Sequence, residues 1–381
     1  MASHRSTSAA RTGALLVAMV LAGLWFHEVH PQLEDRTFAW PGHAEPFHLP
    51  TYLPGDCPFY RATAESILRD ADLDLHNNVA WNVLSPQTQV ALGARGEWYP
   101  KHPIAMALAA LPFYAALGDA GLLLFNLLQT AALDLIIFLL ARRYASDAVS
   151  LATALLFAFG TLLRPAAYNF SPDVFSSLLV AAGVLALLER RCVMAGVLLS
   201  LAVAAKWTNL PFLPLAAIWT LATLGARPAL RFSLAAAPAL LALGGLNAHM
   251  FGSPLVTPYD RVMIMSGGRE VLEPSHRNLF SLPFFATLWK QIVDPVHGLL
   301  RSAPPLLLAL PGFALLFRHA RSEAALLLAL CLAQVAIFAP YKEWSASSYG
   351  HRFLLSAVVL SAAPVAALLA FVLGEQSRLR E

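Results

Sequence analysis

The chain is poor in charge and in cysteine. Only 13% of its 381 residues are Asp, Glu, Lys or Arg, against roughly 25% in an average soluble domain. The net charge is +3 and the basic residues are scattered, so nucleic acid is not an expected partner. Of the three cysteines, only Cys57 falls in an expected outer loop, which predicts no disulfide there. The sequence also lacks CxxC and HExxH motifs, and its histidines do not pair at metal-ligand spacing.

Long apolar runs dominate the rest of the chain, of which 58% is hydrophobic. A membrane-spanning helix needs about 20 mostly apolar residues. Such runs cover residues 12–29, 120–141, 147–163, 174–189, 192–205, 208–224, 229–249, 303–317, 322–340 and 353–373. We therefore expect an all-α fold, a polytopic transmembrane helical bundle of about 10 spans surrounded by membrane lipids.

Pairs of arginines separate these runs at regular intervals. They are Arg5/Arg11, Arg142/Arg143, Arg190/Arg191, Arg227/Arg231, Arg318/Arg321 and Arg378/Arg380. Basic residues in short loops mark the cytoplasmic side, and about 10 crossings place every pair there. No small-residue cleavage site follows the first run, which predicts a retained signal anchor rather than a cleaved peptide. These features predict a protein of the cytoplasmic (inner) membrane with both termini in the cytoplasm.

One further apolar segment, residues 102–118, could change this count to 11. If it crossed the membrane, every later arginine pair would move outside. The segment is short and contains Pro112, so we expect an interfacial or re-entrant helix on the outer side. Residues 1–381 then form a single transmembrane domain, with a first outer loop at 30–119 and a second long outer loop at 250–302. Residues 59–70 are amphipathic, as in a helix lying in the headgroup plane or an ordinary surface helix.

Ionisable side chains stand out in the expected outer segments. Asp56 precedes the amphipathic stretch in a Pro-Gly turn, where it can serve as a general base or simply cap a helix. Lys101 can bind a phosphate or extend to the headgroups. Asp173 closes a short outer loop, and either it or Ser171 could cap the next span.

Three more candidates complete the set. Lys206 ends one span before a tight hairpin, and Arg352 opens the last span. A guanidinium can grip a phosphate with two hydrogen bonds, although Arg352 could instead anchor a helix end. Tyr259, in the second long loop, is a weaker candidate for contact with a lipid or sugar phosphate.

Asp134 differs from these residues because it lies in the middle of a span. Asn126, Thr130 and Asp134 share one helix face at a spacing of four residues. We interpret them as an interhelical hydrogen-bonding stripe, with a proton relay as the alternative.

The topology brings Asp56, Lys101, Asp173, Lys206 and Arg352 to one side of the membrane. Ionisable groups at the edge of the hydrocarbon are costly to place, so their convergence indicates a site for a charged, lipid-borne substrate. If the donor is a sugar on a polyprenyl phosphate, the cations can stabilise the departing phosphate. Asp56 can then take the proton of an incoming lipid, glycan or protein hydroxyl.

These motifs resemble the GT-C superfamily of integral membrane glycosyltransferases, which includes protein O-mannosyltransferases and aminoarabinose transferases. Residues 55–60 (GDCPFY) are similar to the acidic motif of that family's first outer loop. Lys101-His102-Pro103-Ile104 is similar to its Lys-Pro-Pro-Leu segment, whose lysine is associated with the lipid phosphate. Further similar segments are Ser171-Pro172-Asp173, Lys206, and Trp344 with Gly350 and Arg352.

The resemblance implies an inverting hexosyl- or pentosyltransferase that uses a polyprenyl-phosphate sugar at the extracytoplasmic face. It implies catalytic roles for Asp56 and Asp173, and donor contacts for Lys101, His102, Lys206 and Arg352, to which the loop residue Tyr259 is added from its position alone. Cys57 stands where a second acidic residue is usual, which leaves a divalent cation possible but unassigned. No soluble C-terminal domain is expected. Two other functions stay open: a transporter or flippase of lipid-linked sugars, and a non-catalytic subunit of an envelope glycan assembly system.

Overall fold

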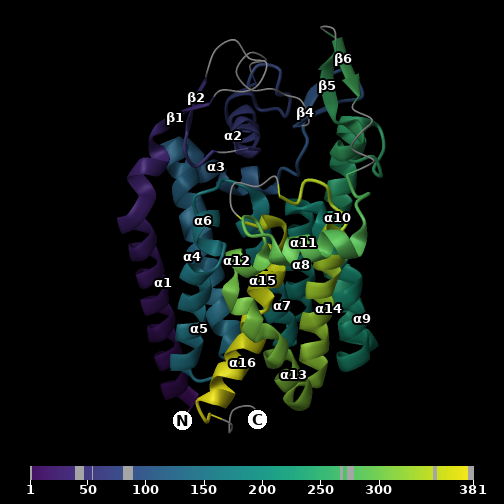
Figure 1. Ribbon diagram of the computed structural model, residues 1–381. Coiled ribbons are helices and arrows are strands. Elements are labelled where there is room, and N and C mark those ends of the chain that lie inside the picture. Colours follow the sequence, from purple (N-terminus) through teal and green to yellow (C-terminus); the bar gives the residue numbers. More distant parts are fainter. Residues whose placement is uncertain are drawn as a thin grey trace.

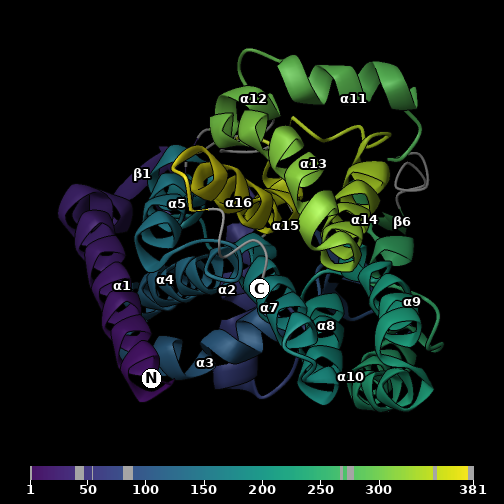
Figure 2. The same ribbon diagram turned by 90° about the horizontal axis from the view of Figure 1, so that it is seen from below.

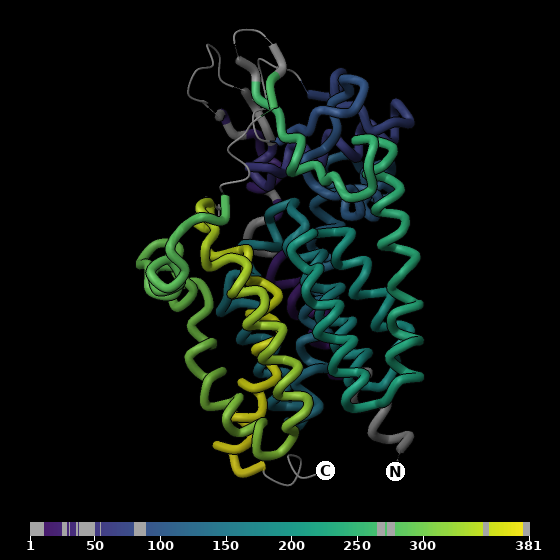
Figure 3. The backbone as a smooth tube through the Cα atoms, turned by 90° about the vertical axis from the view of Figure 1, so that its right-hand side faces the viewer, coloured from purple at the N-terminus to yellow at the C-terminus, as the bar shows by residue number. Residues whose placement is uncertain are grey.

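The computed structural model describes residues 2–38, 47–53, 55–79, 89–266, 269–272, 279–345 and 350–375, and these are mostly helical. The long helices stand side by side as a bundle, with a cap of loops, short strands and short helices at one end (Figures 1 and 3). The start of α1 and the end of α16 lie at the opposite end of the bundle (Figure 1).

Every range predicted to span carries helix. The bundle helices are α1 (Ala2–Leu33), α4 (Asp119–Ala141), α5 (Asp147–Gly160), α7 (Pro172–Leu188), α8 (Cys192–Ala205), α9 (Phe212–Leu224), α10 (Ala226–Phe251), α13 (Ala309–His319), α14 (Arg321–Phe338), α15 (Leu355–Leu360) and α16 (Ala362–Val372). Three of them, α4, α10 and α14, are individually long and apolar enough to cross a membrane. A fourth span forms if α15 and α16, which meet at a bend of 42°, are taken together. The helical bundle is thus confirmed, while a count of about 10 spans stays a prediction.

Helix α8 packs most extensively against α7 and α10, as the view along the bundle also shows (Figure 2). Small residues allow this close approach. At Gly196 of α8, an added Cβ would collide with the backbone carbonyl of Phe232 on α10. This close packing fixes the position of α8 between α7 and α10.

Contacts between distant turns confirm that several arginine pairs share one end. The Arg143 guanidinium lies 2.7 Å from the carboxylate of Glu323, in the first turn of α14. Ser146, after the same α4–α5 turn, donates to Glu375 near the end of the described chain at 2.6 Å. Three predicted cytoplasmic segments therefore meet at this end.

The cap is built from three two-stranded antiparallel sheets and short helices, and the sheets were not predicted. Its elements are β1 (Asp35–Phe38), β2 (Phe47–Pro50), α2 (Cys57–Glu65), the π-helical turn η1 (Ser66–Asp70), β3 (Val90–Leu92), β4 (Trp98–Pro100), α3 (Ala105–Leu117), the short helix η3 (Pro258–Arg261), β5 (Met263–Ser266) and β6 (Arg269–Leu272). The strands are only three or four residues long. Such short runs carry too little alternating pattern to be recognised in a sequence.

Of the two interpretations of residues 59–70, the structure supports an ordinary helix of a small loop domain. Most of α2 is buried, and Phe59 and Ala62 pack in a small core with Val90, Trp98 and Met263. The apolar face of this helix is therefore covered by the cap itself, because the strands supply enough apolar surface to bury it.

The segment 102–118 forms α3, and both of its ends are tied to α2. At its start, His102 lies 3.6 Å from Asp56, the residue that precedes α2. At its end, Asp119 forms a 2.7 Å ion pair with Arg61 of α2. A segment that begins and ends against the same short helix returns to its starting side, which agrees with the prediction of no crossing.

The second long outer loop contains α11 (Phe284–Val293), which lies across the outside of the bundle (Figure 2), followed by the single turns α12 (Leu299–Ser302) and η5 (Pro304–Leu308). Thr287 and Gln291 of α11 are buried, whereas Phe285 and Trp289 are 82% and 65% exposed. Exposed aromatic side chains on a helix lying along the bundle are typical of the membrane interface.

The two ends of the bundle can be assigned to sides of the membrane by cysteine labelling. The native cysteines are all buried, so a variant with Leu255→Cys, Arg190→Cys or Arg318→Cys presents one exposed thiol. We expect an impermeant maleimide added to intact cells to label position 255 and not positions 190 or 318. Labelling at 190 or 318 without permeabilisation would contradict the predicted orientation.

Candidate active site

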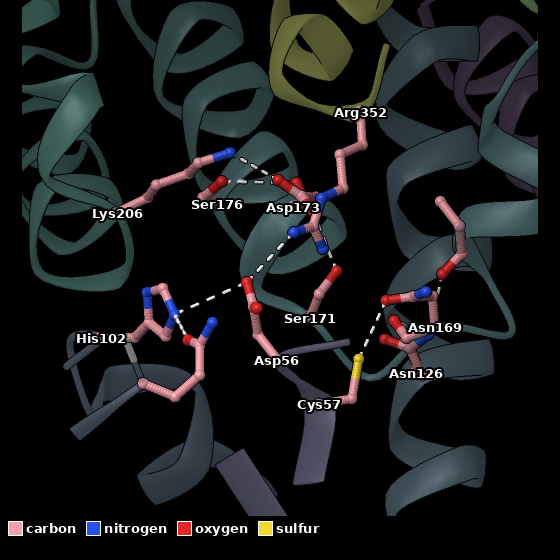
Figure 4. A network of polar contacts seen from close by, with 12 residues as sticks. Asp56, Cys57, His102, Asn126, Asn169, Ser171, Asp173, Ser176, Lys206 and Arg352 are labelled. Atoms are coloured by element: carbon pink, nitrogen blue, oxygen red, sulfur yellow. Dashed lines mark hydrogen bonds and ion pairs between the residues drawn. The ribbon is translucent and has the colours of Figure 1, made fainter. Parts of the chain in front are cut away.

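A cavity of about 610 Å³ lies where the cap meets the bundle. Its walls come from segments that are far apart in the sequence, including α2, the α3 entrance, α7, the α8–α9 hairpin, η3 and the start of the last span. The lining side chains include all seven predicted site residues: Asp56, Lys101, His102, Asp173, Lys206, Tyr259 and Arg352. Figure 4 shows how five of them meet.

Asp56 is placed by a tight turn. Gly55 adopts a left-handed conformation (φ 58°), which glycine tolerates without strain, and Pro58 opens α2 in its first turn; Pro54 lies outside the described residues. Asp56 occupies the N-cap position, yet its side chain makes no capping hydrogen bond. It instead accepts a hydrogen bond from Arg352 Nη2 at 3.1 Å. The capping interpretation of Asp56 is therefore wrong.

Asp173 begins α7 and is surrounded by donors. Its carboxylate accepts from Lys206 Nζ at 2.5 Å and from Ser171 Oγ at 3.0 Å, and lies 3.8 Å from Arg352 Nη1. Asp173 is only 3% exposed. A buried carboxylate in such surroundings is held as an anion by its partners, not by water. Neither Asp173 nor Ser171 makes a side-chain cap of α7.

Arg352 joins the two carboxylates, since Nη2 contacts Asp56 and Nη1 lies near Asp173. It is 8% exposed, which excludes a simple interfacial anchor. Gly350, two residues earlier, has φ 49°, and a side chain there would meet Ser302. Glycine at this position therefore allows the turn that delivers Arg352. The predicted small-residue stretch before it, residues 346–349, lies outside the described residues.

Lys206 and Lys101 approach the cavity from different sides. The Lys206 ammonium lies 5.2 Å from the centre of the Phe353 ring and 5.6 Å from that of Phe338, at cation–π distance. Lys101 is 8% exposed and lines the cavity, so it does not extend to bulk solvent. Its backbone N–H donates to the Gln89 carbonyl at 3.2 Å, which fixes the start of the α3 segment.

His102 connects the acidic side of the cavity to the second long loop. Its Nδ1 lies 3.0 Å from the Tyr259 hydroxyl and its Nε2 lies 3.1 Å from Gln89 Oε1. The ring also stacks on Tyr60, with centres 5.1 Å apart. Burial lowers the pKa of His102 to about 3, despite the opposing effect of Asp56. At neutral pH the ring is therefore uncharged and acts as a hydrogen-bonding bridge.

The pKa of Asp56 reflects two opposed effects. Burial raises it, but the neighbouring His102, Arg352 and Lys101 lower it to about 2. The carboxylate is therefore ionised at every physiological pH. It is also a weak base while Arg352 holds it, because an efficient general base has a pKa nearer the working pH.

The mid-span stripe is only partly as predicted. Asn126 donates to the carbonyls of Ala166, Ala167 and Asn169, which fixes the short loop before α7. That loop in turn accepts a hydrogen bond from Cys57 Sγ on Asn169 at 3.1 Å. The carboxylate oxygens of Asp134 have no hydrogen-bond partner among the described residues. Thr130 donates to the Asn126 carbonyl within the same helix, so in the described part of the chain Asn126 is the stripe residue that bonds to another segment.

Several lining residues were not predicted. Tyr60, Gln89, Phe338, Tyr341, Glu343 and Phe353 all face the cavity. Tyr60 lies four residues after Asp56, so helical spacing could have placed it on the same side. Nothing in the sequence separates Gln89 or Phe338 from ordinary loop and span residues.

A resident metal ion does not fit this donor set. No group of three or more His, Cys, Asp or Glu side chains that could hold a metal occurs in the described ranges. Arg352 and Lys206 already engage two of the carboxylates that line the cavity, those of Asp56 and Asp173. We therefore derive no chemical step through a metal.

The fold is similar to that of several solved structures. ArnT from Cupriavidus metallidurans bound to undecaprenyl phosphate matches with a TM-score of 0.55 and 12% identity over 93% of this chain and 60% of that one. The Archaeoglobus fulgidus oligosaccharyltransferase tethered with an acceptor peptide matches with a TM-score of 0.58 and 13% identity over 95% of this chain and 50% of that one.

The chain thus spans half to three fifths of these proteins. No protein-family model and no curated protein matches it. At these identities the likeness shows a common fold, and the predicted resemblance to the GT-C superfamily is confirmed at that level.

The buried Asp173–Lys206 pair should stabilise the protein measurably. Asp173→Asn leaves Lys206 buried without its carboxylate, and breaking such a pair costs about 3–5 kcal/mol. Asp173→Asn/Lys206→Met removes both charges and should be less destabilised than the single Asp173→Asn variant. Thermal unfolding in detergent measures both.

The Arg142–Asp147 pair provides the control, because its side chains are about a quarter exposed. Asp147→Asn should cost less than about 1 kcal/mol. If Asp173→Asn were as mild as Asp147→Asn, the buried ion cluster would not have the role assigned to it.

Proposed function

We propose that this chain is an inverting glycosyltransferase that moves a hexosyl or pentosyl group from a polyprenyl-phosphate donor to a hydroxyl acceptor. One observation carries the proposal: a cavity in a GT-C fold holds Arg352 between two carboxylates, with Lys206 on the second of them. The acceptor hydroxyl belongs to a lipid, a glycan or a protein. The reaction takes place at the extracytoplasmic face of the inner membrane, in a single domain with both termini in the cytoplasm.

The donor phosphate binds among the three cations of the cavity. Lys101, Lys206 and Arg352 approach it from three different segments. As the bond from the anomeric carbon to the phosphate oxygen breaks, negative charge grows on that oxygen. Fixed cations in a partly dry cavity stabilise this charge more than water does. The Tyr259–His102 pair adds hydrogen-bonding capacity at the same wall.

Phosphate binding also prepares Asp56 for its role. In the free protein His102, Arg352 and Lys101 together keep the pKa of the Asp56 carboxyl at about 2, and Arg352 also donates a hydrogen bond to it. A donor phosphate competes for the same guanidinium. When Arg352 turns to the phosphate, Asp56 loses a neighbouring positive charge and its pKa rises. The base therefore becomes effective only when the donor is present.

The transfer step forms one bond and breaks one bond at the anomeric carbon. Asp56 takes the proton of the acceptor hydroxyl while the acceptor oxygen bonds to the anomeric carbon from the side opposite the phosphate. The products are a glycosylated acceptor with inverted configuration and a polyprenyl phosphate. Asp173 is a positioning residue in this scheme, because it holds Lys206 and Arg352 in place.

The remaining wall suits the lipid part of the donor. Leu279, Phe280, Phe338, Tyr341 and Phe353 line the side of the cavity nearest α14 and the α11 loop. Backbone hydrogen bonds between Leu279 and Lys342, and between Leu282 and Pro340, tie this loop to the end of α14. An apolar wall beside the cations orients a polyprenyl chain away from the reacting carbon, and positioning contributes part of the rate.

Replacing Asp56 by Asn tests the role of the base. General-base catalysis contributes about 10²–10⁴-fold, so Asp56→Asn should reduce transfer at least 100-fold in membranes supplied with radiolabelled polyprenyl-phosphate sugars. The protein level should be unchanged, because Arg352 keeps its contact with Asp173. Asp35→Asn is the matched control, since Asp35 is exposed and lies outside the cavity.

Sugar transfer by Asp56→Asn at the rate of the unaltered protein would contradict the proposed mechanism. Movement of intact lipid-linked sugar across the membrane without transfer would favour a flippase. Absence of both activities from the unaltered protein, with retention in a larger assembly, would favour a non-catalytic subunit.

The pH dependence of turnover tests the movement of Arg352. In the free protein the pKa of Asp56 is lowered from 3.8 to about 2, so its carboxylate is lost only as pH falls through about 2. In the donor complex the pKa rises. We therefore expect the acid limb of kcat at a higher pH than the acid limb of kcat/KM. Acid limbs at the same pH would show that Arg352 stays on Asp56.

A further inference from the structure

One side-chain hydrogen bond joins the turn that carries Asp56 to the loop that leads to Asp173. Cys57, the first residue of α2, donates from Sγ to the side-chain oxygen of Asn169 at 3.1 Å (Figure 4). Cys57 directly follows Asp56, and Asn169 lies four residues before Asp173. The contact therefore connects the two segments that supply the carboxylates of Asp56 and Asp173.

Both partners of this contact are shielded from solvent. Cys57 is 0% exposed and Asn169 is 2% exposed. Burial raises the pKa of the Cys57 thiol well above its usual range, so the group is uncharged at neutral pH and serves as a hydrogen-bond donor. A hydrogen bond in such surroundings is stronger than the same bond in water. Removing the donor costs more than the bond itself, because it leaves an acceptor buried with one partner fewer.

The loop that contains Asn169 is fixed from two further sides. The backbone N–H of Phe170 donates to the carbonyl of Tyr52 at 3.2 Å, which ties the loop to the segment before Asp56. On the other side, the amide of Asn126 donates to three carbonyls of the loop at 2.7 to 3.1 Å. The loop is therefore a fixed support against which the Asp56 turn is held.

Arg352 connects the same two carboxylates across the cavity. The Cys57–Asn169 contact lies outside the cavity lining, so Asp56 and Asp173 are connected by two separate routes. In the proposed donor complex Arg352 turns to the phosphate and the route through the cavity is interrupted. The route through Cys57 and Asn169 is then the one that keeps the Asp56 turn in register with the start of α7.

We propose that Cys57 and Asn169 are positioning residues that hold Asp56 at its place relative to Asp173 while the donor phosphate engages Arg352. This role rests on the proposed function. A general base must lie within hydrogen-bond reach of the proton that it takes, and a misplacement of 1 Å can lower a rate about 100-fold. The contact therefore acts on turnover, whereas donor binding depends on the cations of the cavity.

Two substitutions of Cys57 separate hydrogen bonding from packing. Cys57→Ser keeps a donor, and we expect transfer of radiolabelled sugar from polyprenyl phosphate at close to the rate of the unaltered protein. Cys57→Val removes the donor at a similar side-chain volume and should lower kcat about 10- to 100-fold. The KM for the donor should stay unchanged in both variants, because Lys101, Lys206 and Arg352 are retained.

Cys331→Val is the matched control. Cys331 is also a buried cysteine, and its thiol donates to the Ala357 carbonyl at 3.6 Å, but it does not line the cavity. Its kcat should equal that of the unaltered protein. Thermal unfolding of each variant in detergent checks that the fold is retained.

Infrared spectroscopy tests the contact without turnover. In the full-length protein with Cys192→Ala/Cys331→Ala, the S–H stretching band belongs to Cys57 alone. Asn169→Leu removes the acceptor, so the band should move to higher frequency. Asn247→Leu, which replaces a buried asparagine of α10 that bonds to the Pro254 carbonyl, should leave the band in place.

The outcomes separate this role from the proposed function. Unchanged kcat in Cys57→Val while Asp56→Asn is inactive would overturn the positioning role alone. Equal losses in Cys57→Ser and Cys57→Val, or an S–H band that ignores Asn169→Leu, would do the same. Absence of transfer by the unaltered protein would overturn the proposed function and, with it, this role.

Discussion

The Arg352 guanidinium and its two carboxylates hold the functional end of this protein together. Arg352 comes from the last span, Asp56 from the first outer loop and Asp173 from the start of α7. Lys206, at the end of α8, completes the cluster on Asp173. Four distant segments therefore meet around alternating charges, and the two buried ones, Asp173 and Arg352, are each compensated by an opposite charge nearby.

This mutual dependence connects stability with function. An ion cluster that is fully satisfied fixes the geometry of the cavity, but it also occupies the groups that a phosphate and an acceptor need. The weak basicity of Asp56 in the free protein follows from the neighbouring His102, Arg352 and Lys101, of which Arg352 also donates a hydrogen bond to it. A donor phosphate that takes the place of Asp56 beside Arg352 replaces one anion with another, and the new ion pair offsets the cost of removing the phosphate from water. The cluster can therefore serve both as a structural element and as a binding site.

The helical bundle holds the residues of this ion cluster in place. Helices α7 and α8 carry Asp173 and Lys206 at one end and the turn with Arg190 and Arg191 at the other. Close packing at Gly196 limits their sliding. Ionisable residues are thus concentrated at the two faces where water or headgroups can meet them, while Asp134 is a mid-span carboxyl without a hydrogen-bond partner among the described residues.

The sequence by itself determined the helical ranges, the arginine-bearing turns and the seven candidate residues, while the pair Arg378/Arg380 lies outside the described residues. Apolar length and loop charge are local properties, so they can be read without knowing the fold. Only the tertiary structure decided that Asp56 pairs with Arg352 instead of capping α2, that α2 is covered by the cap, and that Gln89 and Phe338 line the cavity. These outcomes depend on contacts between residues far apart in the chain, which no local pattern encodes.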